Sequence, residues 1–210
     1  MGRLIVIEGL DGAGKRTMAN ALTAEFGGRV ARLAFPRYGE SVHADLVHEG
    51  LHGRLGGFGH EVYGMAMLYA LDRHGAAPDI RAALAENDVV LLDRYVASNA
   101  AFGAARLHQD ARGEFVEWVR SLEIERLRLP VPDAHLLLRV PVAVAASRST
   151  HRSRTEAGRA LDTWESDDAL QARVAAVYDG LAKDDWLAPW QVVDGTSTPD
   201  CAALAATLMG

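Results

Sequence analysis

The first eighteen residues constrain the fold most strongly, because they combine an apolar strand, a glycine-rich turn and a helix start. The run RLIVIE covers residues 3–8, and glycines follow at positions 9, 12 and 14, directly before Lys15. Such a turn can converge several backbone N–H groups on one anion at the N-terminus of a helix. Because strand, spacing and lysine occur together, the segment predicts a phosphate-binding loop rather than a chance glycine turn.

Arg16 breaks the usual pattern of this loop, G-x-x-x-x-G-K-[ST], which has a hydroxyl at that position. One ordinary magnesium contact is therefore missing. Thr17 points about 100° further round the helix, so either Thr17 partly substitutes or other groups and waters hold the ion. The residues predicted to surround the donor phosphates are Gly9, Leu10, Asp11, Gly12, Ala13, Gly14, Lys15, Arg16 and Thr17.

Apolar, strand-like runs alternate with helix-like segments along the whole chain. The strands are expected at 3–8, 29–35, 88–94, 134–140 and 190–194, and the helices at 15–26, 58–85, 95–127, 141–153, 164–184 and 199–208. This alternation predicts an α/β fold with parallel strands buried on both faces. With 210 residues, we expect a single domain covering 1–210.

Composition excludes some partners. The net charge is -6, which argues against non-specific binding to long nucleic acids, although a local cluster of cations could still bind small phosphorylated ligands. Cys201 is the only cysteine and favours a reducing compartment. No apolar run approaches the roughly 20 residues that cross a bilayer. We therefore expect a soluble cytoplasmic protein without nucleic-acid or membrane partners.

The strand at 88–94 ends in Asp93 and Arg94, with Ser98 and Asn99 one turn into the following helix. Carboxyl ends of parallel strands meet at one edge of the sheet, where ligands bind. These side chains are thus expected beside the phosphate loop, although an Asp–Arg pair that only satisfies itself is the structural alternative.

Tyr69 and Arg73 are spaced i and i+4 on one helical face, and FPRYG (35–39) follows the second strand. An aromatic ring that stacks on a base and a guanidinium that binds its carbonyl edge form a plausible nucleobase pocket. Taken alone, Tyr69 would more often be core packing.

The segment from about 146 to 159 is dense in arginine, with Arg148, Arg152, Arg154 and Arg159. It could be a solvated face, but phosphoryl transfer needs cations on the migrating group, and a lid can deliver them while excluding water. We favour a lid. Beyond it, Asp162, Trp164 and Glu165 could contact the acceptor or a metal.

Motifs in this order, over nearly the whole chain, resemble bacterial thymidylate kinases, and the Arg16-containing loop looks most like that of actinobacterial members. The motifs are EGLDGAGKRT, FPRYG, ALDR, DRYVASNAAF, RLRLP and GRALDTWE. The resemblance implies the P-loop nucleoside-monophosphate-kinase fold: a five-stranded parallel sheet with helices on both faces and a short lid. It also implies a homodimer that transfers the γ-phosphoryl group of ATP to dTMP, with Mg²⁺, to give dTDP.

The same resemblance implies residue roles. Tyr69 would stack on thymine and Arg73 would bind its O4 edge. Arg37 and Arg94 would hold the acceptor phosphate. Asp11 would lie beside the acceptor sugar and phosphate. The further residues expected around dTMP are Phe35, Tyr38, Ser98, Asn99, Phe102, Arg159, Asp162 and Trp164.

Gly12 and the basic lid place the chain with family members that carry their catalytic arginines in the lid rather than in the phosphate loop. Phe102 stands where the family often has tyrosine, and Trp164 also stands where tyrosine is expected. Tyr69, where phenylalanine is usual, keeps the stacking face. The lost hydroxyl at Phe102 puts in doubt any discrimination against ribonucleotides that relies on it.

The expected mechanism is in-line phosphoryl transfer that depends on positioning and charge. The residues expected to act in catalysis are Asp11, Lys15, Arg16, Arg94 and Arg152, with Arg148 and Arg154 also on ATP. Asp11, with Glu165 through water, is the hypothesised magnesium site. Two alternatives stay open: a kinase for another nucleoside or nucleotide, and a P-loop switch protein that hydrolyses nucleotide slowly.

Overall fold

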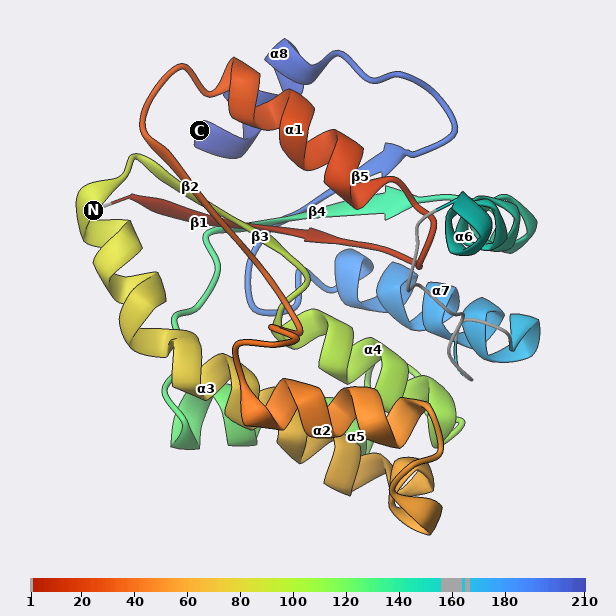
Figure 1. The fold of residues 1–210 in the computed structure, drawn as a ribbon. Helices are drawn as coiled ribbons and strands as arrows, with labels where there is room; N and C mark the ends of the chain where they lie inside the picture. The colour runs from red at the N-terminus through yellow and green to blue at the C-terminus, as the bar shows by residue number, and fades with distance from the viewer. Residues whose placement is uncertain (1, 156–163, 165–166) are drawn as a thin grey trace.

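A five-stranded, all-parallel sheet forms the centre of the molecule in the computed structural model (Figure 1). The structure describes residues 2–155, 164 and 167–210, and the side chains of all of these except 152–155. The strands are β1 (Arg3–Glu8), β2 (Val30–Ala34), β3 (Val89–Asp93), β4 (Ala134–Arg139) and β5 (Trp190–Asp194). Their order is β2-β3-β1-β4-β5. The predicted strands are confirmed to within one residue at each end.

Burial along the strands follows their place in the sheet. β1, β3 and β4 lie inside and are buried along most of their length, whereas β2 and β5 form the two edges and alternate between more and less buried residues. Interior parallel strands covered on both faces need continuous apolar runs. The sequence supplies LIVI in β1, VVLL in β3 and LLL in β4. The sequence pattern therefore fixes which strands are central.

Helices cover both faces of the sheet, as expected (Figure 1). On one face lie α1 (Lys15–Glu25) and α8 (Cys201–Met209). On the other lie α3 (Val62–Glu86), α4 (Val96–Arg106) and α7 (Asp168–Lys183). The α/β class is thus confirmed, and the core fills both sides of the sheet.

The segment 95–127 was predicted as one continuous helix, but the structure divides it into three pieces. α4 ends at Arg106, α5 covers Glu114–Arg120, and a π-helical turn covers Ser121–Arg126. His108 has a φ of 55°, a left-handed conformation that ends a helix. The apolar spacing is similar on both sides of this break, so periodicity alone could not place it.

Two more helices differ from the expectation. The segment 58–85 begins with a 3₁₀ turn at Gly56–His60, and Glu61 is extended before α3 starts. α2 (Val42–Leu51) was not predicted at all. Its start is marked by Ser41, whose hydroxyl accepts a hydrogen bond from the Ala44 N–H at 3.5 Å. Two β-branched residues and a glycine give α2 weak intrinsic helix propensity.

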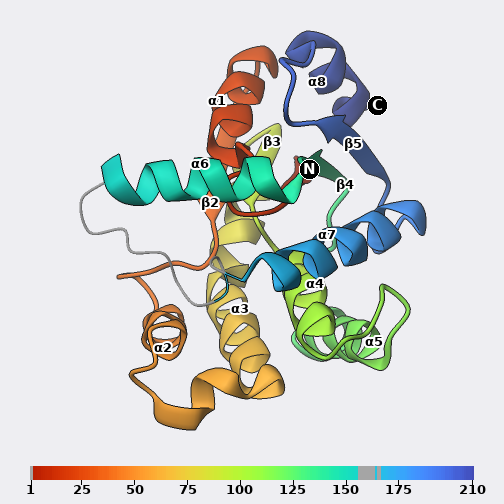
Figure 2. The ribbon, with the colours of Figure 1, turned by 90° about the vertical axis from the view of Figure 1, so that its right-hand side faces the viewer.

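α6 (Val142–Thr155) crosses the carboxyl edge of the sheet (Figure 2). It contains most of the segment predicted as a lid at about 146–159, and residues 156–159 lie outside the described part. The phosphate loop packs directly against the start of α6, because a Cβ on Gly12 would lie 2.1 Å from the Ala145 carbonyl oxygen. Gly12 also has a φ of 88°. An arginine at position 12 would find no room here.

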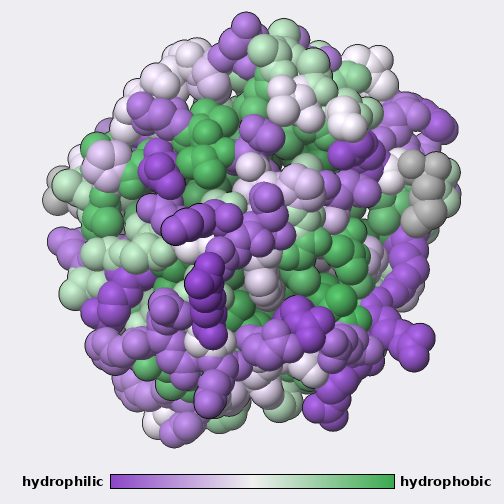
Figure 3. Space-filling view, turned by 180° about the vertical axis from the view of Figure 1, so that it is seen from behind, coloured by the Kyte–Doolittle hydropathy of each residue, from purple (hydrophilic) through white to green (hydrophobic). Residues whose placement is uncertain are grey.

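The face seen from behind carries mainly hydrophilic side chains, with hydrophobic atoms visible in separate areas between them (Figure 3). Among the residues that the structure describes, no helix is both long and apolar enough to cross a membrane.

A matched pair of glycine substitutions tests the packing of α4 against α5. A Cβ on Gly103 would lie 2.0 Å from the ring of Phe115, which is fully buried and cannot move aside. Gly103→Ala should therefore lower the free energy of unfolding by about 1–3 kcal/mol through overpacking, in spite of the better helix propensity of alanine. Urea denaturation measures this loss.

Gly57→Ala is the control, because Gly57 is exposed and no atom lies within 4 Å of its added Cβ. Its free energy of unfolding should stay within about 0.5 kcal/mol of the parent value. Equal stability of the two variants would contradict the packing described.

Candidate active site

One large cavity runs along the carboxyl edge of the sheet. Its volume is about 1270 Å³, above the range of about 300–1000 Å³ that is typical for one drug-sized ligand. Loops after β1, β2, β3 and β5 line it together with α2, α3, α4 and α6. The predicted site residues that line it are Asp11, Gly12, Ala13, Gly14, Lys15, Arg16, Thr17, Phe35, Tyr38, Tyr69, Arg73, Arg94, Ser98, Asn99, Phe102, Arg148 and Trp164.

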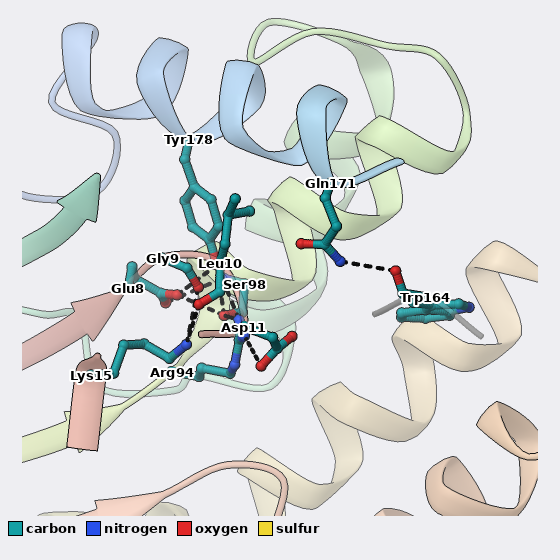
Figure 4. Close-up of polar contacts among 10 residues, drawn as sticks. All are labelled: Glu8, Gly9, Leu10, Asp11, Lys15, Arg94, Ser98, Trp164, Gln171 and Tyr178. Atoms are coloured by element: carbon teal, nitrogen blue, oxygen red, sulfur yellow. Dashed lines mark hydrogen bonds and ion pairs between the residues drawn. The ribbon is translucent and has the colours of Figure 1, made fainter. Parts of the chain in front are cut away.

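Lys15 opens α1 and folds back over the phosphate loop. Its Nζ donates to the carbonyl oxygens of Gly9 at 3.1 Å and Leu10 at 2.9 Å (Figure 4). Gly14 precedes it with a φ of 99°, which a side chain at that position would disfavour. Gly9 and Leu10 do not line the cavity; they contribute to the loop through these carbonyls. Burial, and next the nearby guanidinium of Arg94, lower the pKa of Lys15 to about 8.

Glu8 ends β1 with a carboxylate that is completely buried. Its Oε1 accepts from the backbone N–H groups of Tyr95 at 3.0 Å and Ser98 at 3.2 Å. Its Oε2 accepts from the hydroxyls of Ser98 at 2.6 Å and Tyr178 at 2.8 Å. Glu8 therefore caps the N-terminus of α4 across the sheet edge and ties it to α7 (Figure 4).

Arg94 follows β3 in a left-handed conformation, with a φ of 65°. Its backbone N–H donates to the Ile7 carbonyl at 3.0 Å, so the parallel register of β1 and β3 fixes its place. Its Nη2 donates to Asp11 Oδ1 at 2.8 Å and its Nη1 to Ser98 Oγ at 3.1 Å. Such backbone strain is often found at functional positions.

The charge of Arg94 is secure. Burial alone would lower the pKa of Arg94, but the carboxylate of Asp11 and the other acidic groups around it hold that pKa well above its ordinary value. The result is a permanent cation that is held against the phosphate loop and lines the cavity. The predicted juxtaposition of the two motifs is present in the structure.

Arg73 and Asn99 lie together at the other end of the site. Arg73 donates to Glu123 twice, from Nε at 2.6 Å and from Nη2 at 2.7 Å. Asn99 Nδ2 donates to the Ala66 carbonyl at 3.0 Å and to Glu123 Oε1 at 2.7 Å. Glu123 raises the pKa of Arg73 in spite of its burial, so this guanidinium is also permanently charged.

Three aromatic rings that line the cavity contact one another. Phe102 and Trp164 stack with centroids 6.1 Å apart, and Tyr69 lies 6.3 Å from Trp164. The guanidinium of Arg94 lies over Phe102 at 5.3 Å and that of Arg106 over Trp164 at 4.5 Å. Phe102 and Trp164, which stand where the resemblance leads us to expect tyrosines, thus contact each other through their rings.

Trp164 is also held from α7. Gln171 Nε2 donates to the Trp164 carbonyl at 2.9 Å (Figure 4). Gln171 and Tyr178 are seven residues apart on α7, so the same face of that helix contacts both Trp164 and the Glu8 carboxylate.

Arg37, expected on the acceptor phosphate, contacts Asp72 instead. Its Nε donates to Asp72 Oδ1 at 2.9 Å and its Nη2 to the Asp72 carbonyl at 2.9 Å. The side chain is not among those that line the cavity, so its phosphate role stays a prediction. Five more predicted site residues lie outside the described side chains: Arg152, Arg154, Arg159, Asp162 and Glu165.

Several cavity residues were missed from the sequence. The loop after β5 contributes Gly195, Ser197, Thr198 and Pro199, and Cys201 at the start of α8 follows them. Arg148 Nη1 donates to the Gly195 carbonyl at 3.0 Å. The place of this loop at the carboxyl end of a parallel strand was the signal that could have identified it. Arg106 follows Phe102 by four residues on one helical face, which was a second signal. His48 lies on α2 and His52 directly follows it, and no signal was recognised for this helix.

The acidic groups in the cavity suit a magnesium ion only in combination with phosphates and water. Asp11 lines the cavity with its side chain 25% exposed, and Asp93 lines it nearby. Within the described ranges, no group of three or more His, Cys, Asp or Glu side chains could hold a metal alone. Magnesium commonly takes one or two carboxylates and completes its octahedron with waters and phosphate oxygens. The residues present fit that chemistry.

Removal of the Tyr178 hydroxyl tests the Glu8 network. Tyr178→Phe leaves a buried carboxylate oxygen with one donor fewer and loosens Arg94. We expect kcat/KM for the phosphate acceptor to fall about tenfold, as for loss of a hydrogen bond to a charged group. Tyr63→Phe is the control, since Tyr63 is 44% exposed and does not line the cavity. Unchanged kinetics in Tyr178→Phe would show that the network does not position Arg94.

The lowered pKa of Lys15 predicts proton uptake on nucleotide binding. At about pH 9 the ammonium is largely deprotonated in the protein alone, and bound phosphates favour the charged form. Binding should therefore take up close to one proton, measured by calorimetry in buffers of different ionisation enthalpy. Lys15→Arg, which stays charged, should take up none. Equal uptake in both proteins would contradict this assignment.

Comparison with known proteins agrees with the geometry. The family model for thymidylate kinase matches residues 7–201. A thymidylate kinase of Mycobacterium tuberculosis is 50% identical over 98% of this chain and 96% of its own length. A thymidylate kinase from Xanthomonas oryzae is 34% identical over 95% of this chain and 78% of its own length. The human thymidylate kinase is 28% identical over 94% of this chain and 84% of its own length. The chain therefore belongs to the thymidylate kinase family, which has the P-loop nucleoside-monophosphate-kinase fold.

Proposed function

We propose that this cavity transfers the γ-phosphoryl group of ATP to dTMP, giving ADP and dTDP, in dTTP synthesis. Family membership carries the activity itself. The observation that carries the site assignment is the presence of Lys15, Arg94 and the Arg73–Asn99 pair in one cavity. A phosphate loop, a second phosphate-binding cation and a base pocket are what a two-substrate kinase needs.

The donor end is assigned to the phosphate loop and its surroundings. Backbone N–H groups of the loop and Lys15 would hold the β- and γ-phosphates. Arg148 and the loop after β5 line the same part of the cavity. The arginines of the lid, including Arg152 and Arg154, would neutralise the migrating group, as the family pattern implies.

The acceptor end is assigned to the residues after β2 and β3 and on α3 and α4. The thymine would stack against Tyr69 and meet Arg73 and Asn99, and its phosphate would lie on Arg94. An anionic oxygen of that phosphate attacks the γ-phosphorus while the bond to the β-phosphate oxygen breaks. No general base is needed, because the attacking oxygen carries no proton.

Asp11 is proposed as the protein ligand of magnesium, with Glu165 contributing through water. Magnesium would neutralise charge on the phosphate oxygens. Arg94 contacts the same Asp11 carboxylate, so Asp11 would hold both the acceptor cation and the metal. It would thereby replace the hydroxyl that the loop lacks at Arg16.

A homodimer is proposed on two supports. The resemblance to the family implies one, and three large hydrophobic side chains between residues 58 and 67 are well exposed: Phe58 at 41%, Tyr63 at 44% and Met67 at 47%. A cytoplasmic location is proposed because Cys201 is a free thiol.

Substrate competition separates this proposal from its rivals. Steady-state rates with dTMP, dUMP, dCMP and thymidine should show the highest kcat/KM for dTMP. A clear preference for another acceptor would make the chain a different nucleotide kinase. Slow hydrolysis that no acceptor stimulates would favour a P-loop switch, although a switch does not need a base pocket.

Asp11→Asn tests the metal assignment. The amide is isosteric but neutral, so the variant should bind magnesium more weakly and lose about 100-fold in kcat. Magnesium titration of turnover measures both effects. Asp79→Asn, on the exposed side of α3, is the control and should match the parent. Full magnesium-dependent turnover by Asp11→Asn would exclude Asp11 as the ligand.

A further inference from the structure

Glu123 lies behind the base pocket and does not line the cavity. It is completely buried, yet it accepts three short hydrogen bonds, two from Arg73 and one from Asn99. It belongs to the π-helical turn Ser121–Arg126, and π-helical turns occur often at functional sites. We propose that Glu123 is a positioning residue that determines which pyrimidine the kinase accepts; this inference rests on the proposed function of the cavity.

The side-chain amide of Asn99 is held in one orientation. Its two nearest polar partners, the Ala66 carbonyl oxygen and Glu123 Oε1, can only accept hydrogen bonds. Both N–H groups of the amide are therefore directed to these acceptors, and the opposite flip would place oxygen against oxygen. Oδ1 is then the atom of Asn99 that can address a ligand, and it can only accept.

The guanidinium of Arg73 is held by the same carboxylate. Glu123 binds Nε and Nη2 in a bidentate pair, which fixes the plane of the guanidinium. Nη1, the nitrogen not bonded to Glu123, can only donate. One carboxylate thus sets an acceptor and a donor side by side in the cavity that Arg73 and Asn99 line.

This acceptor and donor match the edge of one kind of pyrimidine. Thymine and uracil present an N3–H donor next to the O4 acceptor, which is complementary to Asn99 Oδ1 and Arg73 Nη1. Cytosine presents an unprotonated N3 acceptor next to an N4 amino donor, which would oppose acceptor to acceptor and donor to donor. A site built around fixed buried polar groups can reject such a mismatch strongly. Glu123 therefore selects an imide base over an amino-pyrimidine.

Glu123→Gln tests the inference with an isosteric change. A glutamine amide can donate as well as accept, so Asn99 is no longer held in one orientation and Arg73 loses its counter-charge. We expect the ratio of kcat/KM for dTMP to that for dCMP to fall at least tenfold, mainly through KM for dTMP. An unchanged ratio would overturn the inference, because a purely structural role would lower both rates together.

Asp72→Asn is the matched control. Asp72 is also buried, is also paired with an arginine and precedes Arg73 on the same helix. Its loss should lower stability but leave the dTMP-to-dCMP ratio unchanged, since the hydrogen bonds that the structure gives Asp72 go to Arg37, not to Arg73 or Asn99. A similar fall of the ratio in both variants would show general loosening and would overturn the inference.

Glu123→Asp is measured if Glu123→Gln does not fold. The shorter carboxylate cannot keep both Arg73 and Asn99, so a smaller fall of the ratio, about threefold, is expected, and no fall would overturn the inference. The activity of the parent enzyme distinguishes failure of the proposed function from failure of the role of Glu123. A parent without dTMP kinase activity refutes the proposed function, whereas an active parent with an unchanged variant ratio refutes only the role of Glu123.

Discussion

The buried carboxylate of Glu8 is the interaction on which the phosphate end of the site depends. It lies at the last residue of a central strand and accepts four hydrogen bonds from the start of α4 and from α7. A charge at this depth is costly unless it is fully hydrogen-bonded, so these partners are held in one arrangement. The position of Arg94 depends on this arrangement, because Ser98 and Asp11 hold its guanidinium beside the phosphate loop.

The same device recurs at the base end. Arg73 binds the buried carboxylate of Glu123 directly, and Arg94 is linked to the buried carboxylate of Glu8 through Ser98. Both arginines line the cavity, whereas neither glutamate does. Buried ion pairs contribute little net stability, because desolvation of the charges offsets their attraction. Their value here is geometric: they hold cations at two fixed points, which a kinase for a small nucleotide needs in order to bind a base and a phosphate at once.

The fold was largely predictable from the sequence, and the helix boundaries less so. Central strands are continuous apolar runs, so β1, β3 and β4 could be placed within one residue. Motifs at the ends of β1 and β3 could be brought together because parallel strands share a carboxyl edge. α2 could not be found, since its intrinsic propensity is weak and its packing against α3 is a tertiary effect.

Partners of the site residues were harder to predict than the residues themselves. Tyr69, Arg73 and Asn99 lie where their motifs suggested. Glu123 lies 24 residues after Asn99 and 50 after Arg73, in a π-helical turn that no periodicity marks. Arg37 also has a partner that its motif did not indicate: Asp72, 35 residues away, accepts a hydrogen bond from its side chain. Its predicted contact with the acceptor phosphate stays a prediction. Long-range side-chain pairs of this kind are decided by packing.

A crystal structure with dTMP, a non-hydrolysable ATP analogue and magnesium tests the central claim most directly. We expect both nucleotides in the one cavity, with the acceptor phosphate on Arg94, a carboxylate oxygen of Asp11 in the magnesium coordination sphere and the N3–H of thymine on Asn99 Oδ1. An acceptor phosphate away from Arg94, with magnesium held without Asp11, would contradict the claim that this pair joins the two substrates.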